Sequence, residues 1–500
     1  MYKHEVLDKM SREERQIFAA ELRKSLSGEN GFLNPFTNRI EKATTSTGMV
    51  SGLGLLPIPL EAPASLLYPT STPLRNSIPR NVTGGPAVNF RKVTGINTAK
   101  LWGSVAEATS ATSGLNSAIG YAADLVTVNY KSVSMNTLLT PEAQFGSRSS
   151  IASEQDFGAE EFAILSLLQS TMLAEEYIDL GGCTTALGTP ATPTALSTQG
   201  AAGTGTLTPG ATYSVKVSAL NFKGYLQGAK GNGGADADGE TIASNVLTVT
   251  IAGSAAGSDS LSFKWAATYG AAAYNVYAYT STTVRYVETV TVNTYVLKAL
   301  GSSTNVINTA DKTATATDYN GILQMCTATT AGYRSSLDGA TLTADGTTGV
   351  SEISALFLSL FNAYKIGPDK LLMGGRLKKK VDSVVAGSTA PVLRIDATAG
   401  DLNITGTIGL KSIMNPFMNV DVPIEIHPWI PDGMILAPVV NSLGAYYQNA
   451  RIGSNLTKYL GWDYRKFETF TKRAREMNID FNGALVNHAD FAFASISNVG

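Results

Sequence analysis

The sequence has few of the residues from which reactive centres and disulfide frameworks are built. Its 500 residues include two cysteines and three histidines, and only 16% are charged. Two cysteines, Cys183 and Cys326, form neither a disulfide framework nor a zinc cluster, so they predict free thiols in a reducing compartment. The opening stretch MYKHEVLDKMSREERQ lacks the apolar core of a signal peptide, and no apolar run is long enough to span a membrane. These absences argue against disulfide-rich secreted proteins and membrane proteins.

Candidate catalytic residues are scarce and fall into no recognised pattern. A Ser-His-Asp triad would have to use His4, His427 or His488, and His427 lies in the apolar stretch IEIHPWIP, where a structural role is predicted. Neither a GxxxxGK[ST] phosphate loop nor an HExxH zinc motif is present. The stretch MGGRLKKK (373–380) is interpreted as a solvated helix start. We therefore predict no enzymatic activity, no catalytic, cofactor-binding or metal-binding residue, and no cofactor.

One loop, GADADGETIASN, gathers three carboxylates: Asp236, Asp238 and Glu240. Clustered carboxylates can hold Ca²⁺, but the spacing departs from the EF-hand. Gly234 stands where the first ligand belongs, and Asn245 where the closing Glu belongs. A solvated loop is therefore favoured over a calcium site.

The first 140 residues predict an arm followed by a hairpin. Residues 1–26 carry a helical pattern, whereas residues 27–85 are rich in Gly, Pro, Thr and Ser and have no period. Such a segment is typical of an arm that lies against a partner. In residues 86–140, two strand-like stretches, VNFRKVTG and ADLVTVNYKSVSMNTLLT, flank a soft segment of small residues. They predict a long hairpin without a core of its own.

Three later stretches have the apolar spacing of helices. The clearest covers residues 153–180, begins at a candidate N-cap, Ser153, and stops at a pair of glycines. At 1.5 Å per residue it would be roughly 40 Å long. TGVSEISALFLSLFNAYKIGP (348–368) predicts an amphipathic helix, and RLKKKVDSVVAG (376–387) predicts a basic one.

The middle of the chain, residues 184–317, predicts a separate β-module. Five short strands bounded by turns are typical of a β-sandwich. Its predicted core has three inward-facing residues: Trp265, Tyr274 and Val276. The stretches LTPGATYSVKVSALNFKG (207–224) and SLSFKWAATYGAAAYNVYAYTS (260–281) resemble a fibronectin type III or related immunoglobulin-like domain. The aperiodic segment 301–317, at ~3.3 Å per residue, is long enough to carry the chain back across such a module.

Outside this module, the segments run in the order arm, long hairpin, long helix, α/β region and strands. Six motifs follow that order: FRKVTGINTAKLWGSVAEAT (90–109), LVTVNYKSVSMNTLLTPE (125–142), AEEYIDLGG (174–182), DYNGIL (318–323), PDKLLMGGRLKKKV (368–381) and IMNPFMNVDVPIEIHPWIPDGMILAP (413–438). Together they resemble the major capsid protein of tailed bacteriophages, whose fold also forms the floor of herpesvirus capsids. The resemblance implies an α+β capsid fold with an inserted all-β immunoglobulin-like sandwich.

The resemblance also divides the chain. It implies an N-terminal helix and arm at 1–85, an extended-loop (E-loop) hairpin at 86–140, a peripheral domain with a spine helix at 141–191, an inserted domain at 192–312, an axial domain at 313–440, and a C-terminal part at 441–500 that returns to the peripheral and axial core. Insertions are tolerated where ends are exposed and few contacts cross, so the inserted domain is expected on the outer surface of a shell.

The function implied by the resemblance is structural. Copies of the chain would assemble, as hexamers and pentamers, into an icosahedral head shell that encloses packaged double-stranded DNA. The implied location is the virion, assembled in the host cytoplasm, with portal and decoration or scaffolding proteins as further partners and no membrane. The alternative is a secreted or cell-surface adhesion protein carrying a fibronectin-like module.

A formal net charge of −2 argues against a strongly basic nucleic-acid binder, but basic residues gather near the C-terminus. They are Arg451, Lys458, Arg465, Lys466, Lys472, Arg473 and Arg475. Two roles are open: non-specific contact with DNA phosphates, and ion pairs with acidic residues of neighbouring subunits. We favour the ion pairs between subunits.

Some members of the family join the hairpin tip of one subunit to its neighbour through a Lys–Asn bond. The tip here, residues 103–125, contains no Lys, and Lys100 lies before it. We therefore expect no such cross-links, so particles boiled in detergent should give one band near the monomer mass; a ladder of multimers would contradict this. We also expect residues 1–26 to remain in mature particles as an inner-face helix or arm.

Overall fold

The structure is a computed structural model that describes residues 32–34, 39–41, 71–96, 121–142, 159–197, 205–230, 236–252, 259–304, 307–345, 349–386, 409–441, 443, 454–471 and 474–500. The chain forms two compact units, and the larger one comprises residues 68–137, 165–469 and 476–500. In the smaller unit, strands β1 (Phe32–Asn34) and β2 (Arg39–Glu41) pair antiparallel. The predicted helix over 1–26, residues 103–120 of the hairpin tip and Ser153 lie outside the described residues.

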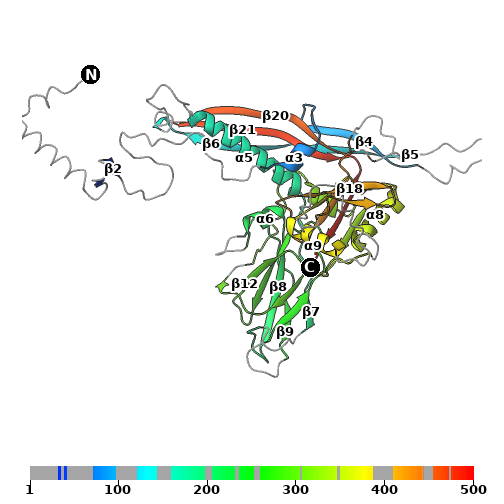
Figure 1. Ribbon diagram of the computed structural model, residues 1–500. Helices are drawn as coiled ribbons and strands as arrows, with labels where there is room; N and C mark the ends of the chain where they lie inside the picture. Colours follow the sequence, from blue (N-terminus) through cyan, green and yellow to red (C-terminus); the bar gives the residue numbers. More distant parts are fainter. Residues whose placement is uncertain are drawn as a thin grey trace, which may run out of the picture. The chain divides into compact units, whose positions relative to one another are not determined.

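The predicted hairpin is present at its base (Figure 1). Strands β4 (Ala87–Ile96) and β5 (Tyr121–Asn129) pair antiparallel and form a sheet of two strands. The returning strand was predicted to run unbroken to residue 140, and this is wrong. It breaks at Tyr130, whose N–H donates to the carbonyl of Pro86 at 3.0 Å, and β6 (Lys131–Leu139) continues in another sheet. Among the described residues, the hairpin is therefore not joined to the body by a strand ladder.

That other sheet has four strands, in the order β3 (Arg80–Val82), β20 (Leu456–Thr471), β21 (Ala474–Asn487) and β6. Alternate residues of β21 are buried on one face: Met477, Ile479 and Phe481. The predicted long helix is confirmed as α5 (Ala159–Gly181), whose 23 residues span roughly 35 Å.

The glycines that stop α5 are required by close packing. A Cβ on Gly181 would lie 2.2 Å from the ring of Phe222, and one on Gly182 would lie 2.2 Å from the carbonyl oxygen of Tyr319. A side chain at either position would displace what packs on the helix end. The glycines thus end the helix and also admit two later segments of the chain.

A mixed six-stranded sheet carries the main core. Its order is β15 (Tyr333–Ser336), β22 (Phe493–Ser497), β19 (Ile435–Pro438), β16 (Leu371–Met373), β18 (Val420–Ile426) and β17 (Ser412–Asn415). The two later helices are confirmed as α8 (Ser351–Tyr364) and α9 (Gly375–Ala386), and a short helix, α7 (Ile322–Thr327), precedes them. The apolar face of α8 packs in this core through Ile353, Leu356, Phe357 and Leu360. The fold is therefore a mixed α+β fold.

The predicted β-module is a two-sheet sandwich. The five predicted strands are β8 (Thr212–Leu220), β9 (Leu247–Thr250), β10 (Leu261–Lys264), β11 (Ala273–Tyr279) and β12 (Arg285–Val290). Three further strands were not predicted: β7 (Thr194–Ser197), β13 (Thr294–Leu297) and β14 (Ser303–Thr304). Trp265, Tyr274 and Val276 are buried together between the sheets, as predicted, with the rings of Trp265 and Tyr274 edge-to-face at 5.3 Å.

The strand order of the sandwich is unusual. One sheet runs β13-β10-β7 and the other runs β14-β12-β11-β8-β9. In an immunoglobulin constant domain, the first two strands share a sheet with the fourth and fifth. Here the first, fourth and seventh strands share one instead, so the fibronectin or immunoglobulin assignment stays a prediction.

Both ends of the module meet at one neck. The amide of Thr315 donates to the carbonyl of Cys183 at 2.9 Å, and the amide of Leu187 donates to the Oγ1 of Thr313, also at 2.9 Å. The returning segment was predicted to be an aperiodic linker, but the buried side chain of Asn308 anchors it to the backbone of Ala237 and Glu240. The incoming and outgoing segments therefore run side by side, as an insertion requires.

Candidate functional site

The three carboxylates of the loop GADADGETIASN have separate partners in the structure. Asp236 accepts a hydrogen bond from the amide of Thr309 at 2.7 Å, and Asp238 lies 3.7 Å from Lys223. Glu240 was predicted in a solvated loop, and this is wrong: it is fully buried. Its Oε1 accepts hydrogen bonds from three side chains of the sandwich: Ser218, Asn275 and Tyr277. Within the described ranges, no three His, Cys, Asp or Glu side chains converge as metal ligands, and no helix there is long and apolar enough to cross a bilayer.

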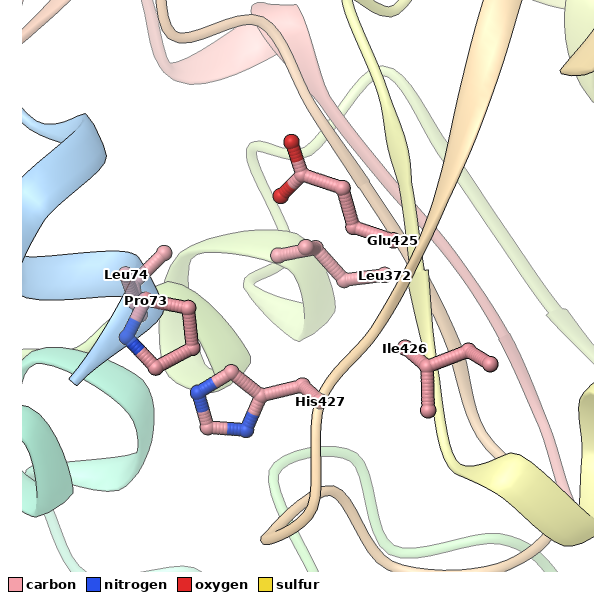
Figure 2. Close-up of a pocket in the computed structure, with 6 residues that line it drawn as sticks. All are labelled: Pro73, Leu74, Leu372, Glu425, Ile426 and His427. Atoms are coloured by element: carbon pink, nitrogen blue, oxygen red, sulfur yellow. The ribbon is translucent and has the colours of Figure 1, made fainter. Parts of the chain in front are cut away.

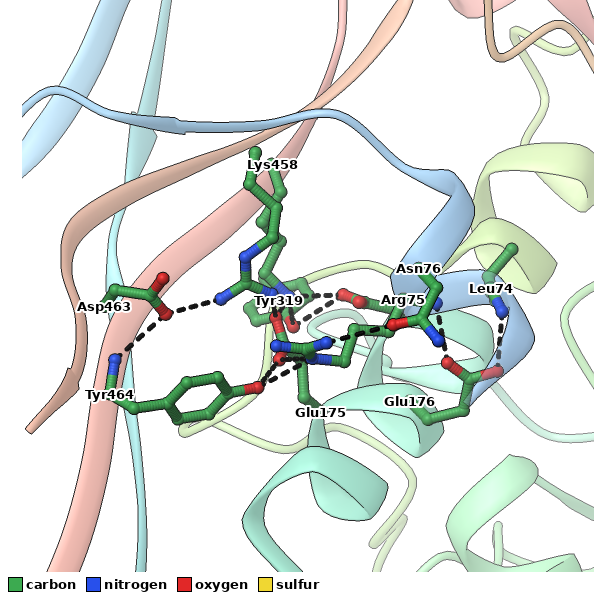
Figure 3. A network of polar contacts seen from close by, with 11 residues as sticks. Leu74, Arg75, Asn76, Glu175, Glu176, Tyr319, Lys458, Asp463 and Tyr464 are labelled. Atoms are coloured by element: carbon green, nitrogen blue, oxygen red, sulfur yellow. Dashed lines mark hydrogen bonds and ion pairs between the residues drawn. The ribbon is translucent and has the colours of Figure 1, made fainter. Parts of the chain in front are cut away.

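The structure contains a buried cluster of charged side chains and two tyrosines (Figure 3). Segments far apart in the sequence supply it, namely the stretch before the hairpin, the end of α5, the neck of the sandwich and β20. We call it the ion cluster and define it by Arg75, Arg80, Glu175, Asp179, Tyr319, Lys458 and Tyr464. It joins the end of α5 and the neck of the sandwich to β3 and β20, which are already neighbours in one sheet.

Glu175 is the anionic centre of the ion cluster. Its Oε1 lies 2.5 Å from a guanidinium nitrogen of Arg80 and 3.0 Å from the Nζ of Lys458. Its Oε2 accepts from the Nε of Arg75 at 2.9 Å and from the hydroxyl of Tyr464. Burial alone would raise the pKa of this carboxyl, but Lys458 and Arg80 outweigh it and hold the pKa at about 2.

Lys458 connects Glu175 to a second carboxylate. Its Nζ lies 2.5 Å from the Oδ1 of Asp179 and donates to the hydroxyl of Tyr319, which itself donates to Asp179 at 2.7 Å. Burial raises the pKa of Asp179 to about 6, Lys458 opposes that rise, and the negative charge of Glu175 adds to it. Burial, together with both carboxylates, also keeps the pKa of Tyr319 well above its usual value, so the phenol remains a donor.

Glu176, the next residue of α5, holds a different segment. Its two oxygens accept from the backbone amides of Leu74 and Arg75 at 2.9 and 2.7 Å, at the start of the short helix α3 (Pro73–Ser77). Amides at the start of a helix have no acceptor within that helix. The carboxylate of Glu176 supplies the missing acceptors. His427 was predicted to be structural, and its Nε2 lies 2.7 Å from the Oε1 of Glu176. Neighbouring carboxylates of α5 thus fix α3 and β20.

A cavity of about 190 Å³ lies beside this junction, lined by Pro73, Leu74, Leu372, Glu425, Ile426 and His427. Figure 2 shows the His427 ring next to Pro73, with Glu425 and Leu372 on the strand side. Glu425 is engaged by Lys370 at 2.9 Å. The cavity is smaller than the roughly 300 Å³ of ordinary ligand pockets, which fits a gap in packing rather than a binding site.

The basic residues near the C-terminus separate into several environments. Lys458 was predicted to face DNA or a neighbouring subunit, and this is wrong, because only 1% of its side chain is exposed and its partners belong to its own chain. Arg475 pairs with Glu160 at 2.8 Å and Lys466 with Glu468 at 2.5 Å, again within the chain. Arg465 stacks over Trp462. Arg451, Lys472 and Arg473 lie outside the described residues, as does His4.

The sequence does carry a signal for the ion cluster that went unused. AEEYIDLGG places three carboxylates in the last turns of the helix, where the helix dipole favours cations by about 0.3–1 kcal/mol. Carboxylates at such a position therefore favour cationic partners nearby. The stretch was interpreted only as the acidic end of a spine helix, because nothing in the sequence pairs it with Arg75, Arg80 or Lys458.

The two buried carboxylates predict opposite pH responses of stability. Glu175 has a depressed pKa, so its contribution is complete above pH 4.5 and is lost as the pH falls towards 2. Asp179 has a raised pKa, so its contribution is complete below pH 3.8 and is lost as the pH rises through about 6. The matched variants Glu175→Gln and Asp179→Asn each remove one titration. Denaturant midpoints from pH 3 to 8, subtracted from wild type, should therefore slope in opposite directions, and two flat curves would contradict the assignment.

No protein-family model matches this chain, and no curated protein is similar to it in sequence. Solved structures that are similar to this chain include two capsids and an encapsulin. The capsid of a native GTA particle is 10% identical with a TM-score of 0.40, covering 90% of this chain and 98% of that one. The capsid of cyanophage A-1(L) is 8% identical with a TM-score of 0.42, covering 89% and 97%. The SrpI encapsulin of Synechococcus elongatus PCC 7942 is 8% identical with a TM-score of 0.37, covering 88% and 92%.

Proposed function

We propose that this chain is the structural major capsid protein of a tailed bacteriophage, which assembles with copies of itself into a shell that encloses double-stranded DNA. The observation that carries the proposal is the β4–β5 hairpin. It is a sheet of only two strands, and Leu125 on β5 is 67% exposed. An isolated two-stranded hairpin is marginally stable in water. Such a hairpin gains stability by packing on another molecule, and identical copies supply that surface in a closed assembly.

The ion cluster supports the same proposal. An assembling subunit has to keep one shape while its neighbours bind, and the cluster ties α3, α5, the neck and β20 together. The sandwich has both ends at one neck, which supports an insertion displayed on the outer surface of the shell. Portal, decoration or scaffolding proteins and packaged DNA would be further partners. A secreted adhesin is less well supported, because the main core lies outside the sandwich.

The proposal is tested by the assembly state of purified protein. Wild type is expected to sediment as shells or capsomers, with particles visible in electron micrographs. Leu125→Glu places a charge where a neighbour would bury the side chain, removing a contact worth about 1.5–3 kcal/mol each time it recurs. We expect that variant to fold and to remain dissociated.

A matched control distinguishes assembly from general damage. Leu196 on β7 is 56% exposed on the sandwich, so Leu196→Glu makes the same chemical change on the part proposed to face outward. It should assemble like wild type. Wild-type protein that stays a monomer, or equal assembly by both variants, would overturn the proposal.

A further inference from the structure

The base of the hairpin rests on a histidine with unusual surroundings. His488 follows β21, and its ring lies 4.7 Å from that of Phe90 on β4, at an interplanar angle of 67°. Its other aromatic neighbour is Tyr459 on β20, at 6.2 Å and 81°. Both ring nitrogens are shielded from solvent and have no hydrogen-bond partner among the described residues. The imidazole therefore packs as an apolar ring between two edge-on aromatics.

Charged groups surround this ring without bonding to it. Lys92 on β4 has its Nζ 3.2 Å from both carboxylate oxygens of Asp490, just after His488 in the chain. Asp124 on β5 stands opposite Lys92 in the strand register. Neither carboxylate is hydrogen-bonded to the imidazole in the part of the chain that the structure describes. A proton on His488 would thus be shielded from water, lack an acceptor and lie near an existing cation.

Because His488 lies at the base of the hairpin, its protonation would affect how the hairpin packs on the body. Because the β4–β5 sheet has no third strand in the described ranges, side chains at its base determine how it packs on the body. We name Phe90, Lys92, Tyr459, His488 and Asp490 the hairpin seat. We propose that the hairpin seat is a proton-sensitive switch, which holds the hairpin while His488 is neutral and releases it when the ring takes up a proton.

The direction of the response follows from the environment of the ring. Burial, and then the charge of Lys92, lower the pKa of His488 below its ordinary 6.5. A base with a depressed pKa stabilises the closed seat above pH 6.5 and loses that contribution as the pH falls through its own pKa. A single proton changes such an equilibrium by at most about tenfold per pH unit.

Hydrogen exchange of the full-length protein tests the switch. After correction for intrinsic rates, amides of residues 87–96 and 121–129 should exchange faster in wild type as the pH falls from 7.5 to 5, by up to about tenfold per pH unit. His488→Phe keeps an aromatic ring that cannot titrate and should abolish the change. An unchanged acid response in that variant, or no response in wild type, overturns the proposal. His427→Gln serves as the control and should keep the response of the hairpin peptides.

A second measurement covers the case in which His488→Phe does not fold. Exchange at the imidazole C2 position, followed by mass spectrometry of the peptide containing His488, gives the pKa of that ring in wild type. It should lie below the value for the same peptide in urea-unfolded protein, and an equal or higher value would exclude the switch. Both measurements are made on the folded chain, so their results do not depend on whether the chain assembles into shells.

Discussion

Replacing Lys458 with Met is expected to lower the free energy of unfolding by about 3–5 kcal/mol, because it leaves the buried carboxylate of Asp179 without its cation and Glu175 with only Arg75 and Arg80. Glu175 and Asp179 lie 3.0 and 2.5 Å from its Nζ, and both are almost fully buried. Methionine has a similar length and apolar character, so the cavity left behind is small. Denaturant unfolding at pH 7 measures the loss directly.

A lysine on the same strand provides the control. Lys466 pairs with Glu468 at 2.5 Å, but about a third of each side chain is exposed, at 34% and 28%. Pairs of this kind contribute about 1 kcal/mol or less, so Lys466→Met should have little effect. Equal losses for the two variants would show that the ion cluster adds nothing beyond a surface pair.

A triple variant separates the contribution of the ion cluster to stability from its contribution to assembly. Replacing Lys458, Glu175 and Asp179 together by Met, Met and Leu removes the three most deeply buried charges of the ion cluster and leaves Arg75 bonded to Tyr464 at 2.8 Å. Buried ion groups that are replaced together are often neutral or stabilising. Arg80 would retain Asp463 as a partner at 2.7 Å. If the triple variant is stable but fails to assemble, the cluster serves to fix one subunit shape and contributes little to stability.

The parts of the fold that the sequence predicted are those governed by local pattern. Helix α8 could be predicted because its apolar residues recur at helical spacing up to Gly367 and Pro368, and β11 because Tyr and Val alternate. The break at Tyr130 could not, since strand propensity continues through it. β5 and β6 are separate strands because β5 pairs with β4 and β6 pairs with β21. Local sequence does not indicate which strands will pair.

The ion cluster was missed for the same reason. Lys458 looked like one basic residue among seven near the C-terminus, and only the fold brings it to a helix end almost 280 residues earlier. His427 is a case in which burial could be predicted from the sequence but the bonding partner could not. Its apolar flanks predicted burial correctly, yet its partner, Glu176, lies in a different element. Sequence pattern can predict which residues are buried but not which of them meet.

Contacts at the neck of the sandwich determine what a deletion of the module should do. Phe222 begins the short helix α6 (Phe222–Gln227), belongs to the inserted segment and yet is buried in the main core, with Tyr177 of α5 edge-on at 6.4 Å. Asn293 also reaches outside the module, to Asp338 at 2.6 Å. Removing residues 192–312 would therefore leave a hole at the end of α5. A point substitution in the core of the sandwich is therefore a better test of whether the sandwich folds independently of the main core.

Trp265→Ala is that substitution, and we expect it to lower the stability of the sandwich by about 3–5 kcal/mol, as truncation of a large buried aromatic usually does. Trp265 is 3% exposed and packs against Phe263 at 5.9 Å as well as Tyr274. A small domain has about 5–15 kcal/mol in all, so the sandwich should open in a large fraction of molecules. Hydrogen exchange should rise in β8, β10 and β11 while α8 stays protected.

Tyr269→Ala is the matched control in the same module. Tyr269 is 40% exposed and has Arg334 stacked over its ring at 4.3 Å, a contact worth about 1 kcal/mol. That variant should leave exchange in the sandwich strands close to wild type. In Trp265→Ala, shells should still form if the module is only displayed, since the hairpin and the ion cluster remain intact. Increased exchange that spreads from the sandwich into α5 and α8, with loss of particles, would show instead that Phe222 couples the two cores and that the shell subunit folds as one piece.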